Sequence, residues 1–195
     1  MQSSRLEAFS DGVLAIIITI MVLELHLPDE PTFDAFVHET GLPLLTYLLS
    51  FIYVGIYWNN HHHLFQIVEH VDGIVLWANL HLLFWLSLFP LSTAWIDEEH
   101  VTRDPAILYG ANLLGAAVAY YLLQLSIQRL PSGKRLAEAL GRDVKGKISP
   151  VLYLCGIGLA FVAPRFSIVP YVLVALMWLV PDRRLEHWLQ ENAAD

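Results

Sequence analysis

The N-terminal part of the chain contains an apolar run that is long enough to cross a lipid bilayer. It extends from Arg5 to about Leu27, which is 23 residues or roughly 34 Å of helix at about 1.5 Å per residue. Arg5, Ser10 and Asp11 lie within seven residues at the start of this run. Charged groups at that depth are costly unless they are paired, so they usually serve a function. We therefore predict a transmembrane helix with a functional polar cluster at one end.

The composition of the whole chain is that of a membrane protein. Hydrophobic residues make up 56% of its 195 residues and charged residues 15%, whereas an ordinary soluble domain has about 25% charged residues. The mean hydropathy of +0.52 points the same way. We therefore predict one all-α integral membrane domain over residues 1–195, without a separate soluble module.

Apolar runs bounded by charges and prolines predict six transmembrane helices. Their approximate limits are 5–27, 42–65, 73–96, 105–127, 148–163 and 166–180. The last two runs are short and closely joined through Pro164 and Arg165. These two could therefore also form a hairpin that does not cross the membrane fully.

Lys and Arg residues are concentrated on one side of the predicted spans. Of the 11, six fall in the loop 128–147, and Arg5 and two arginines of the tail 181–195 share its side. Only Arg103 and Arg165 lie on the other side, where the loops are acidic. The positive-inside rule then predicts that both termini, the basic loop and the tail are cytoplasmic. The acidic loops are either merely tolerated outside or concentrate cations at an outer entrance.

The chain lacks the residues that several classes of function require. The net charge of −8 argues against nucleic-acid binding, which requires a basic patch. His61, His62 and His63 point about 100° apart on a helix and cannot all face one ion, so neither a metal site nor another cofactor is predicted. The single Cys155 allows no intrachain disulfide. No set of residues typical of a membrane-embedded enzyme is apparent, and we predict no enzymatic activity.

One side of the first predicted helix carries a stripe of small and apolar residues with a single hydroxyl. At about 100° per residue, the stripe consists of Gly12, Ile16, Thr19, Ile20, Leu23 and Leu27. Such a stripe is most often a surface for packing against another helix. In a symmetric assembly, however, it would repeat around an axis and form rings. Apolar rings can close a pore by dewetting, and Thr19 would supply a ring of hydroxyls between them.

Polar residues near the cytoplasmic end of the first three spans form a second group. Because Asp11 lies at membrane depth, we expect it to be paired, since unpaired buried charge costs several kcal/mol. Its partner could be Arg5, from the same or a neighbouring chain, or a group at the cytoplasmic end of the second span, which is Trp58, Asn60, His61 or His62. Arg5 could also serve only as a topology anchor. The group is predicted to fix the first helix against the next two, and its other members are Trp58, Asn60, His61, His62 and Asn79.

Two of these motifs resemble the signature of a known family. Arg5-x-x-x-Phe9-Ser10-Asp11, followed by a glycine and an apolar helix, resembles the signature of the lysosomal-type potassium channel family, the transmembrane protein 175 family. The stretch WNNHHHLF, which begins at Trp58, resembles the family's Trp-x-Asn-His-His-x-x-Phe stretch, although His63 stands where a basic residue is expected. The similarity covers the first three spans, and the last three agree in number and topology.

The resemblance implies a homotetramer in which the first helix lines a central pore. It implies that Ile16, five residues after the motif aspartate, is the apolar gate and that Leu23 forms the next ring, with Ile20 between them. It also implies that Thr19 determines the preference for potassium. The expected function is a potassium-permeable channel that also passes other monovalent cations. Because the chain has one six-span unit, a prokaryotic plasma membrane is the expected location.

The alternative function is a secondary transporter of a cation or of a proton-coupled substrate. Transporters commonly have broken helices and ionisable groups near the membrane midplane. The first predicted helix has no glycine or proline between Val13 and Leu27, and its centre holds no ionisable residue. The sequence therefore favours the channel.

Overall fold

The computed structural model of the protein describes residues 1–99, 101–131 and 144–179. The predicted tail and most of the predicted basic loop lie outside these residues. In chain order, the helical elements are α1 Ser3–Leu23, α2 Phe33–Ala35, the π-helical η1 Phe36–Thr40, α3 Gly41–Gln66, α4 Gly73–Ser87, α5 Phe89–Glu99, α6 Arg103–Gln128, α8 Val144–Ala160, the 3-10 helix η3 Pro164–Ser167 and α9 Ile168–Leu179.

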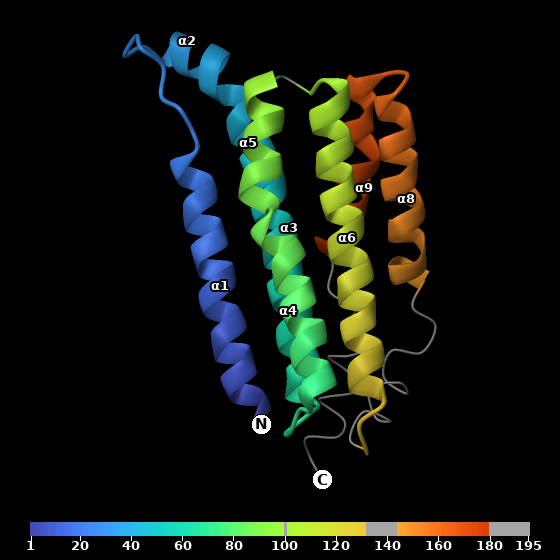
Figure 1. Ribbon diagram of the computed structural model, residues 1–195. Helices are drawn as coiled ribbons and strands as arrows, with labels where there is room; N and C mark the ends of the chain where they lie inside the picture. Colours follow the sequence, from blue (N-terminus) through green and yellow to red (C-terminus); the bar gives the residue numbers. More distant parts are fainter. Residues whose placement is uncertain (100, 132–143, 180–195) are drawn as a thin grey trace.

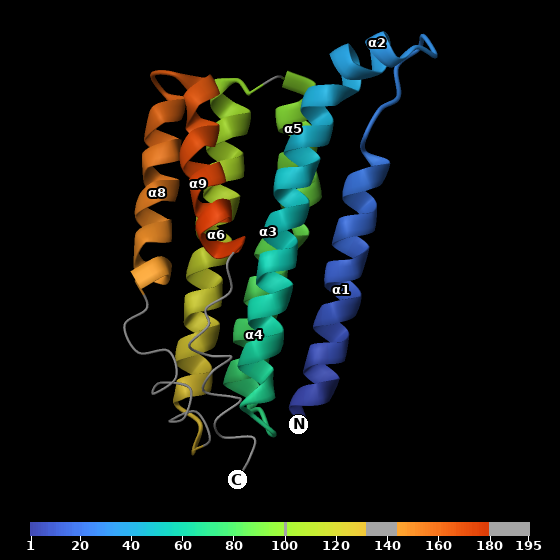
Figure 2. The ribbon, with the colours of Figure 1, turned by 180° about the vertical axis from the view of Figure 1, so that it is seen from behind.

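The long helices run alternately up and down and form one bundle (Figure 1). α4 and α5 lie end to end and together extend along the length of the bundle. α1 lies at one edge of the bundle, and α8 lies at the other edge, as seen from both sides (Figures 1 and 2). This arrangement leaves one side of α1 without a neighbouring helix in the subunit.

Four helical stretches in the described part of the chain are long and apolar enough to cross a membrane. They are Ser3–Leu23, Phe33–Gln66, Gly73–Asp97 and Arg103–Gln128. α8 has 17 residues and α9 has 12, which is short for the roughly 20 residues of a full span. The all-helical membrane fold is therefore confirmed, while crossing by the last two helices stays a prediction.

The first helix ends at Leu23, four residues before the predicted limit. Pro28 follows closely and disfavours the α conformation in the residue before it, which is Leu27. Leu27 is 79% exposed in the connection and so does not continue the helical stripe. The next helix begins earlier than predicted, because the hydroxyl of Thr32 accepts a hydrogen bond from Ala35 N at 3.2 Å and caps the start of α2.

The third predicted span is interrupted at Leu88, between α4 and α5. Pro90 has no backbone N–H and cannot continue the hydrogen bonding of α4. Asn112 of α6 bonds to backbone groups on both sides of this break. Its side-chain amide is oriented so that both its nitrogen and its oxygen have hydrogen-bond partners. Its nitrogen then donates to the carbonyl of Trp85 at 2.7 Å, and its oxygen accepts from Phe89 N at 3.3 Å. The break is therefore built into the packing of α6 against α4 and α5.

α6, α8 and α9 are held together by one large side chain between two glycines. Tyr171 of α9 is fully buried, and a Cβ atom at Gly110 or Gly156 would lie 2.0 or 2.2 Å from its side chain. The Tyr171 hydroxyl donates to the carbonyl of Ala106 at 3.2 Å. The close approach of these three helices therefore requires the absence of a side chain at both positions.

The base of α1 is tied to the connection between α3 and α4. The amino group of Met1 donates to the carbonyl of Val71, and Val71 N donates to the carbonyl of Met1, both at 2.9 Å. Ser3 N donates to the carbonyl of Glu69 at 3.0 Å. These bonds fix where α1 starts, and side-chain contacts higher up fix its rotation.

Candidate functional site

α1 has a buried side and an uncovered side. The residues that face the rest of the subunit recur every three or four positions, as expected for one side of a helix, and they are Ser3, Leu6, Ser10, Leu14, Ile17 and Met21. On the opposite side, Ile16 is 58% exposed, Ile20 41% and Leu23 80%. Gly12 and Thr19 are also exposed there. Every helical member of the predicted stripe thus lies on the uncovered side.

Three buried polar side chains connect α1, α3 and α4 in a directional chain. His61 Nε2 lies 2.8 Å from Asn79 Oδ1, and because that oxygen can only accept, the histidine nitrogen carries the proton. Asn79 Nδ2 donates to Ser10 Oγ at 2.9 Å, and Ser10 Oγ donates to the carbonyl of Leu6 at 2.9 Å. Ser10 and Asn79 have no exposed surface, and His61 is 1% exposed. Among the described residues His61 Nδ1 is buried without a partner, but direct hydrogen bonds join the three side chains, and a buried chain of this kind favours one rotation of α1.

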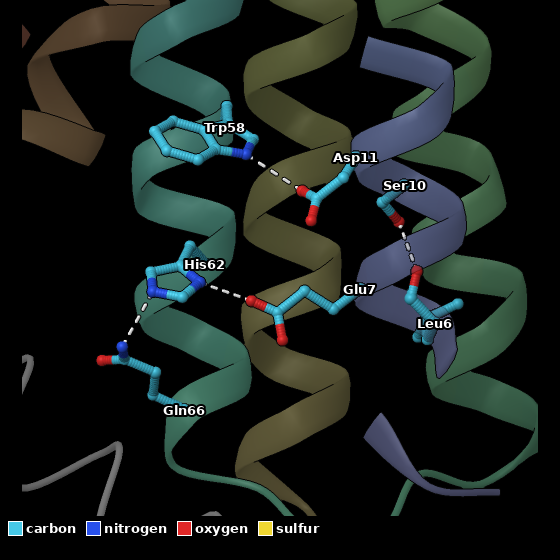
Figure 3. Close-up of polar contacts among 7 residues, drawn as sticks. All are labelled: Leu6, Glu7, Ser10, Asp11, Trp58, His62 and Gln66. Carbon is cyan, nitrogen blue, oxygen red and sulfur yellow. Dashed lines mark hydrogen bonds and ion pairs between the residues drawn. The ribbon is translucent and has the colours of Figure 1, made fainter. Parts of the chain in front are cut away.

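Two further contacts join α1 to α3 at its more exposed edge (Figure 3). The indole Nε1 of Trp58 donates to Asp11 Oδ1 at 3.0 Å. One turn lower, His62 Nδ1 is bonded to Glu7 Oε1, and Gln66 Nε2 lies 2.8 Å from His62 Nε2. The amide of Gln66 donates, so His62 Nε2 accepts and His62 Nδ1 is the donor to Glu7. The carboxylate of Asp11 is therefore paired with Trp58 and not with Arg5.

Two predicted members of the polar group, and Phe9 of the first motif, take no part in these contacts. The amide of Asn60 donates to the carbonyl of Ile56 in its own helix at 2.8 Å. Phe9 is 53% exposed on the uncovered side of α1. Arg5 is exposed, and no hydrogen bond or ion pair joins it to another residue of the described part of the chain.

Glu7 is the contact residue that the sequence reasoning missed. It precedes Asp11 by four residues, and Trp58 precedes His62 by four residues. Residues with this spacing are neighbours on one side of a helix, so two carboxylates on α1 face two aromatic N–H donors on α3. This matched four-residue spacing on the two helices is the sequence feature that could have identified Glu7 as the partner of His62.

Thr19 is the one hydroxyl on the uncovered side of α1 above the motif. Its Oγ1 donates to the carbonyl of Ile16 at 2.8 Å. Because the single proton of the hydroxyl is used within the helix, the oxygen lone pairs remain available to a donor or a cation. The uncovered side thus offers apolar surface and one oxygen acceptor.

Comparisons with known proteins identify the family to which the chain belongs. The family model described as endosomal/lysosomal potassium channel TMEM175 matches residues 5–90, which include both polar motifs. A potassium channel of a Chryseobacterium species is 52% identical over 194 residues, which are 98% of this chain and 100% of that protein. A potassium channel of Streptomyces collinus is 29% identical over 188 residues, or 91% of each chain.

A solved structure is similar along almost the whole length. It is the crystal structure of a lysosomal potassium-selective channel TMEM175 homolog from Chamaesiphon minutus, with a TM-score of 0.76, 27% identity, and coverage of 93% of this chain and 97% of that chain. The family and these relatives are ion channels and not enzymes. The chain is a multi-pass membrane protein that belongs to the TMEM175 family, as a member of the prokaryotic type.

Proposed function

We propose that the protein is a potassium-permeable cation channel in which α1 lines the pore of a homotetramer. The observation that carries this proposal is the division of α1 into a side fixed by polar contacts and an apolar side without a neighbour in the subunit. Relatives that are named potassium channels cover almost the whole chain. Potassium and other monovalent cations are the proposed permeant ions.

In this proposal, the uncovered residues of α1 form rings around the symmetry axis. Ile16, Ile20 and Leu23 form apolar constrictions that close the pore by dewetting, because a narrow apolar passage excludes water and the ion's hydration shell. Thr19 lies between them, and its lone pairs replace part of the hydration shell of a passing cation. The Ser10, Asn79 and His61 chain holds α1 in the rotation that this arrangement needs.

The same proposal includes six membrane crossings per subunit with both termini in the cytoplasm of a plasma membrane. The N-terminus and the last turn of α6 lie at the same end of the bundle, whereas the first turn of α8 lies nearer its middle (Figure 1). Arg5 lies near the start of α1 and Arg129 directly follows α6, so that end carries positive charge of the kind expected on the cytoplasmic side. Crossing by α8 and α9 requires local thinning of the bilayer or anchoring of their ends at the interface.

The gate is tested by placing a polar side chain on the uncovered side of α1. In planar bilayers, Ile16→Asn should raise the resting current by about tenfold, because a hydrated ring lowers the barrier to an ion by about 1.4 kcal/mol. Currents of the unmodified protein should reverse toward the potassium equilibrium potential.

The matched control is Leu154→Asn on α8, because Leu154 is 56% exposed, like Ile16, but lies at the other edge of the bundle. Its resting current should equal that of the unmodified protein. An unchanged current in Ile16→Asn would remove Ile16 from the gate. Saturable flux coupled to a second ion, without unitary currents, would instead indicate a transporter.

A further inference from the structure

A second group of buried polar side chains lies between α3, α5 and α6, toward the C-terminal end of α5. Ser50 of α3 is hydrogen-bonded to Thr93 of α5, with 2.7 Å between the two hydroxyl oxygens. Its hydroxyl also lies 3.0 Å from the hydroxyl of Tyr109 on α6. Ser50, Thr93 and Tyr109 are all at least 97% buried. None of these residues takes part in the contacts of α1 described above.

Asp97 stands at the outer end of this group. It lies four residues after Thr93, and Thr46 lies four residues before Ser50, so Asp97 and Thr46 are each one helical turn beyond the bonded pair. The Thr46 hydroxyl donates to the carbonyl of Leu42 at 3.2 Å, and its oxygen is a polar neighbour of the Asp97 carboxyl group. The antiparallel helices α3 and α5 thus bring one carboxylate and the hydroxyls of Thr46, Ser50 and Thr93 together along their interface.

One oxygen of the Asp97 carboxyl group is buried without a partner. Asp97 Oδ1 has almost no exposed surface and forms no hydrogen bond with the part of the chain that the structure describes. The ion pairs formed among the described residues do not include Asp97. The neighbouring Arg103 is bonded to Asp104 at 2.8 Å, and both side chains are exposed. A buried carboxylate oxygen in this state is costly unless a positive group reaches it.

The surroundings of Asp97 favour a cation. Asp97 lies in the last turn of α5, where the helix dipole places partial negative charge. The segment 97–104 carries four acidic residues and one arginine, and a field of this sign raises the local concentration of cations. The available ligands are a carboxylate oxygen and hydroxyl oxygens, which suit hard cations and not soft metals.

We propose that Asp97, together with the hydroxyls of Thr46 and Thr93, forms a binding site for a monovalent alkali cation between α3 and α5. A single carboxylate balances a single positive charge. The described residues contain no group of three or more His, Cys, Asp or Glu that could hold a metal ion, so a divalent ion would remain uncompensated. The site is separate from the uncovered side of α1 and does not rest on the proposed pore.

The site is tested by thermal unfolding of the purified full-length protein in detergent. The unfolding midpoint is compared in chloride salts of sodium, potassium and N-methyl-D-glucamine at equal ionic strength and pH. Sodium or potassium should raise the midpoint by about 3 °C over N-methyl-D-glucamine, because a ligand that binds only the folded state stabilises it. Asp97→Asn should lose this shift, and Thr93→Val should reduce it without any change in charge.

The matched control is Asp104→Asn, which removes an exposed carboxylate from the same segment and should keep the full shift. An equal shift in Asp97→Asn, or no shift in the unmodified protein, overturns the proposal. Loss of the shift in Thr19→Ala together with its retention in Asp97→Asn would locate the ion at α1 and also overturns it. An unfolding midpoint that changes with pH but not with the cation would show that Asp97 binds a proton instead, and this result also overturns the proposal.

Discussion

At the scale of single residues, the orientation of α1 depends on a few polar side chains that are hydrogen-bonded to one another in the buried contact of α1 with α3 and α4. Asn79 has the central position, because its oxygen accepts from His61 and its nitrogen donates to Ser10. Hydrogen bonds between membrane helices average about 0.6 kcal/mol and rarely exceed about 1.7 kcal/mol. Their contribution here is mainly to specificity, because any other rotation of α1 would take Ser10 Oγ away from the buried Asn79 Nδ2 that donates to it.

Asn79→Ala is expected to destabilise the folded subunit by about 2 kcal/mol, because buried His61 Nε2 loses its acceptor and buried Ser10 Oγ loses its donor. The measurement is the unfolding midpoint of the purified protein in detergent. Asn60→Ala is the matched control, since the amide of Asn60 bonds only to its own helix, and it should change the midpoint little. Equal effects of the two substitutions would show that the buried chain does not stabilise the fold.

At the scale of elements, close packing of α6, α8 and α9 depends on glycines at particular positions. Gly156 and Gly158 both lie in α8, two residues apart and therefore on different sides of the helix. A Cβ atom at Gly156 would lie 2.2 Å from the Tyr171 ring and 3.0 Å from the backbone oxygen of Ser167, whereas a Cβ atom at Gly158 would meet nothing within 4 Å. The two glycines therefore have different roles.

Gly156→Ala is expected to destabilise the protein by about 1–3 kcal/mol through overpacking against Tyr171. Gly158→Ala is expected to have the opposite sign and to stabilise α8 by about 0.5–1 kcal/mol, because alanine favours the helix and meets no neighbour. Thermal unfolding of the two variants in detergent measures this difference. If the Gly156→Ala protein were as stable as the Gly158→Ala protein, close packing of Tyr171 against Gly156 would not be needed for the fold.

At the scale of the whole molecule, α1 lies at an edge of the subunit (Figure 1). Its uncovered side therefore faces either lipid or a second copy of the chain. Both environments accept Ile16, Ile20 and Leu23, so apolar character alone does not distinguish them. Symmetric contact around a common axis is the arrangement on which the proposed channel depends.

Cross-linking between subunits tests this arrangement directly. In a Cys155→Ser background, which removes the only native cysteine, Leu23→Cys should form covalent dimers in membranes after mild oxidation, because rings at an axis bring equivalent residues together. Leu154→Cys, on the exposed side of α8 at the other edge, should remain monomeric on a denaturing gel. Cross-linking at Leu154 and none at Leu23 would place α1 on the outside of the assembly.

The sequence by itself determined the class of the protein, the approximate positions of the long apolar helices and the residues that form the two motifs. Long apolar runs exclude a soluble fold, and the spacing of Ser10 and Asp11 before such a run predicted a paired polar group at the start of α1. The stripe with Ile16 and Leu23 followed from the helical period alone. These features are local, so they depend only on residues a few positions apart.

The tertiary structure decided which side of α1 is covered and which groups pair. Leu14 and Ile17 are as apolar as Ile16 and Ile20, so hydrophobicity could not tell the buried side from the uncovered one. Asp11 had several possible partners, and only the packing of α1 on α3 selects Trp58 and brings Glu7 to His62. These choices depend on residues about 50 positions apart in the chain, whose relative placement is fixed by the packing of whole helices and not by local sequence.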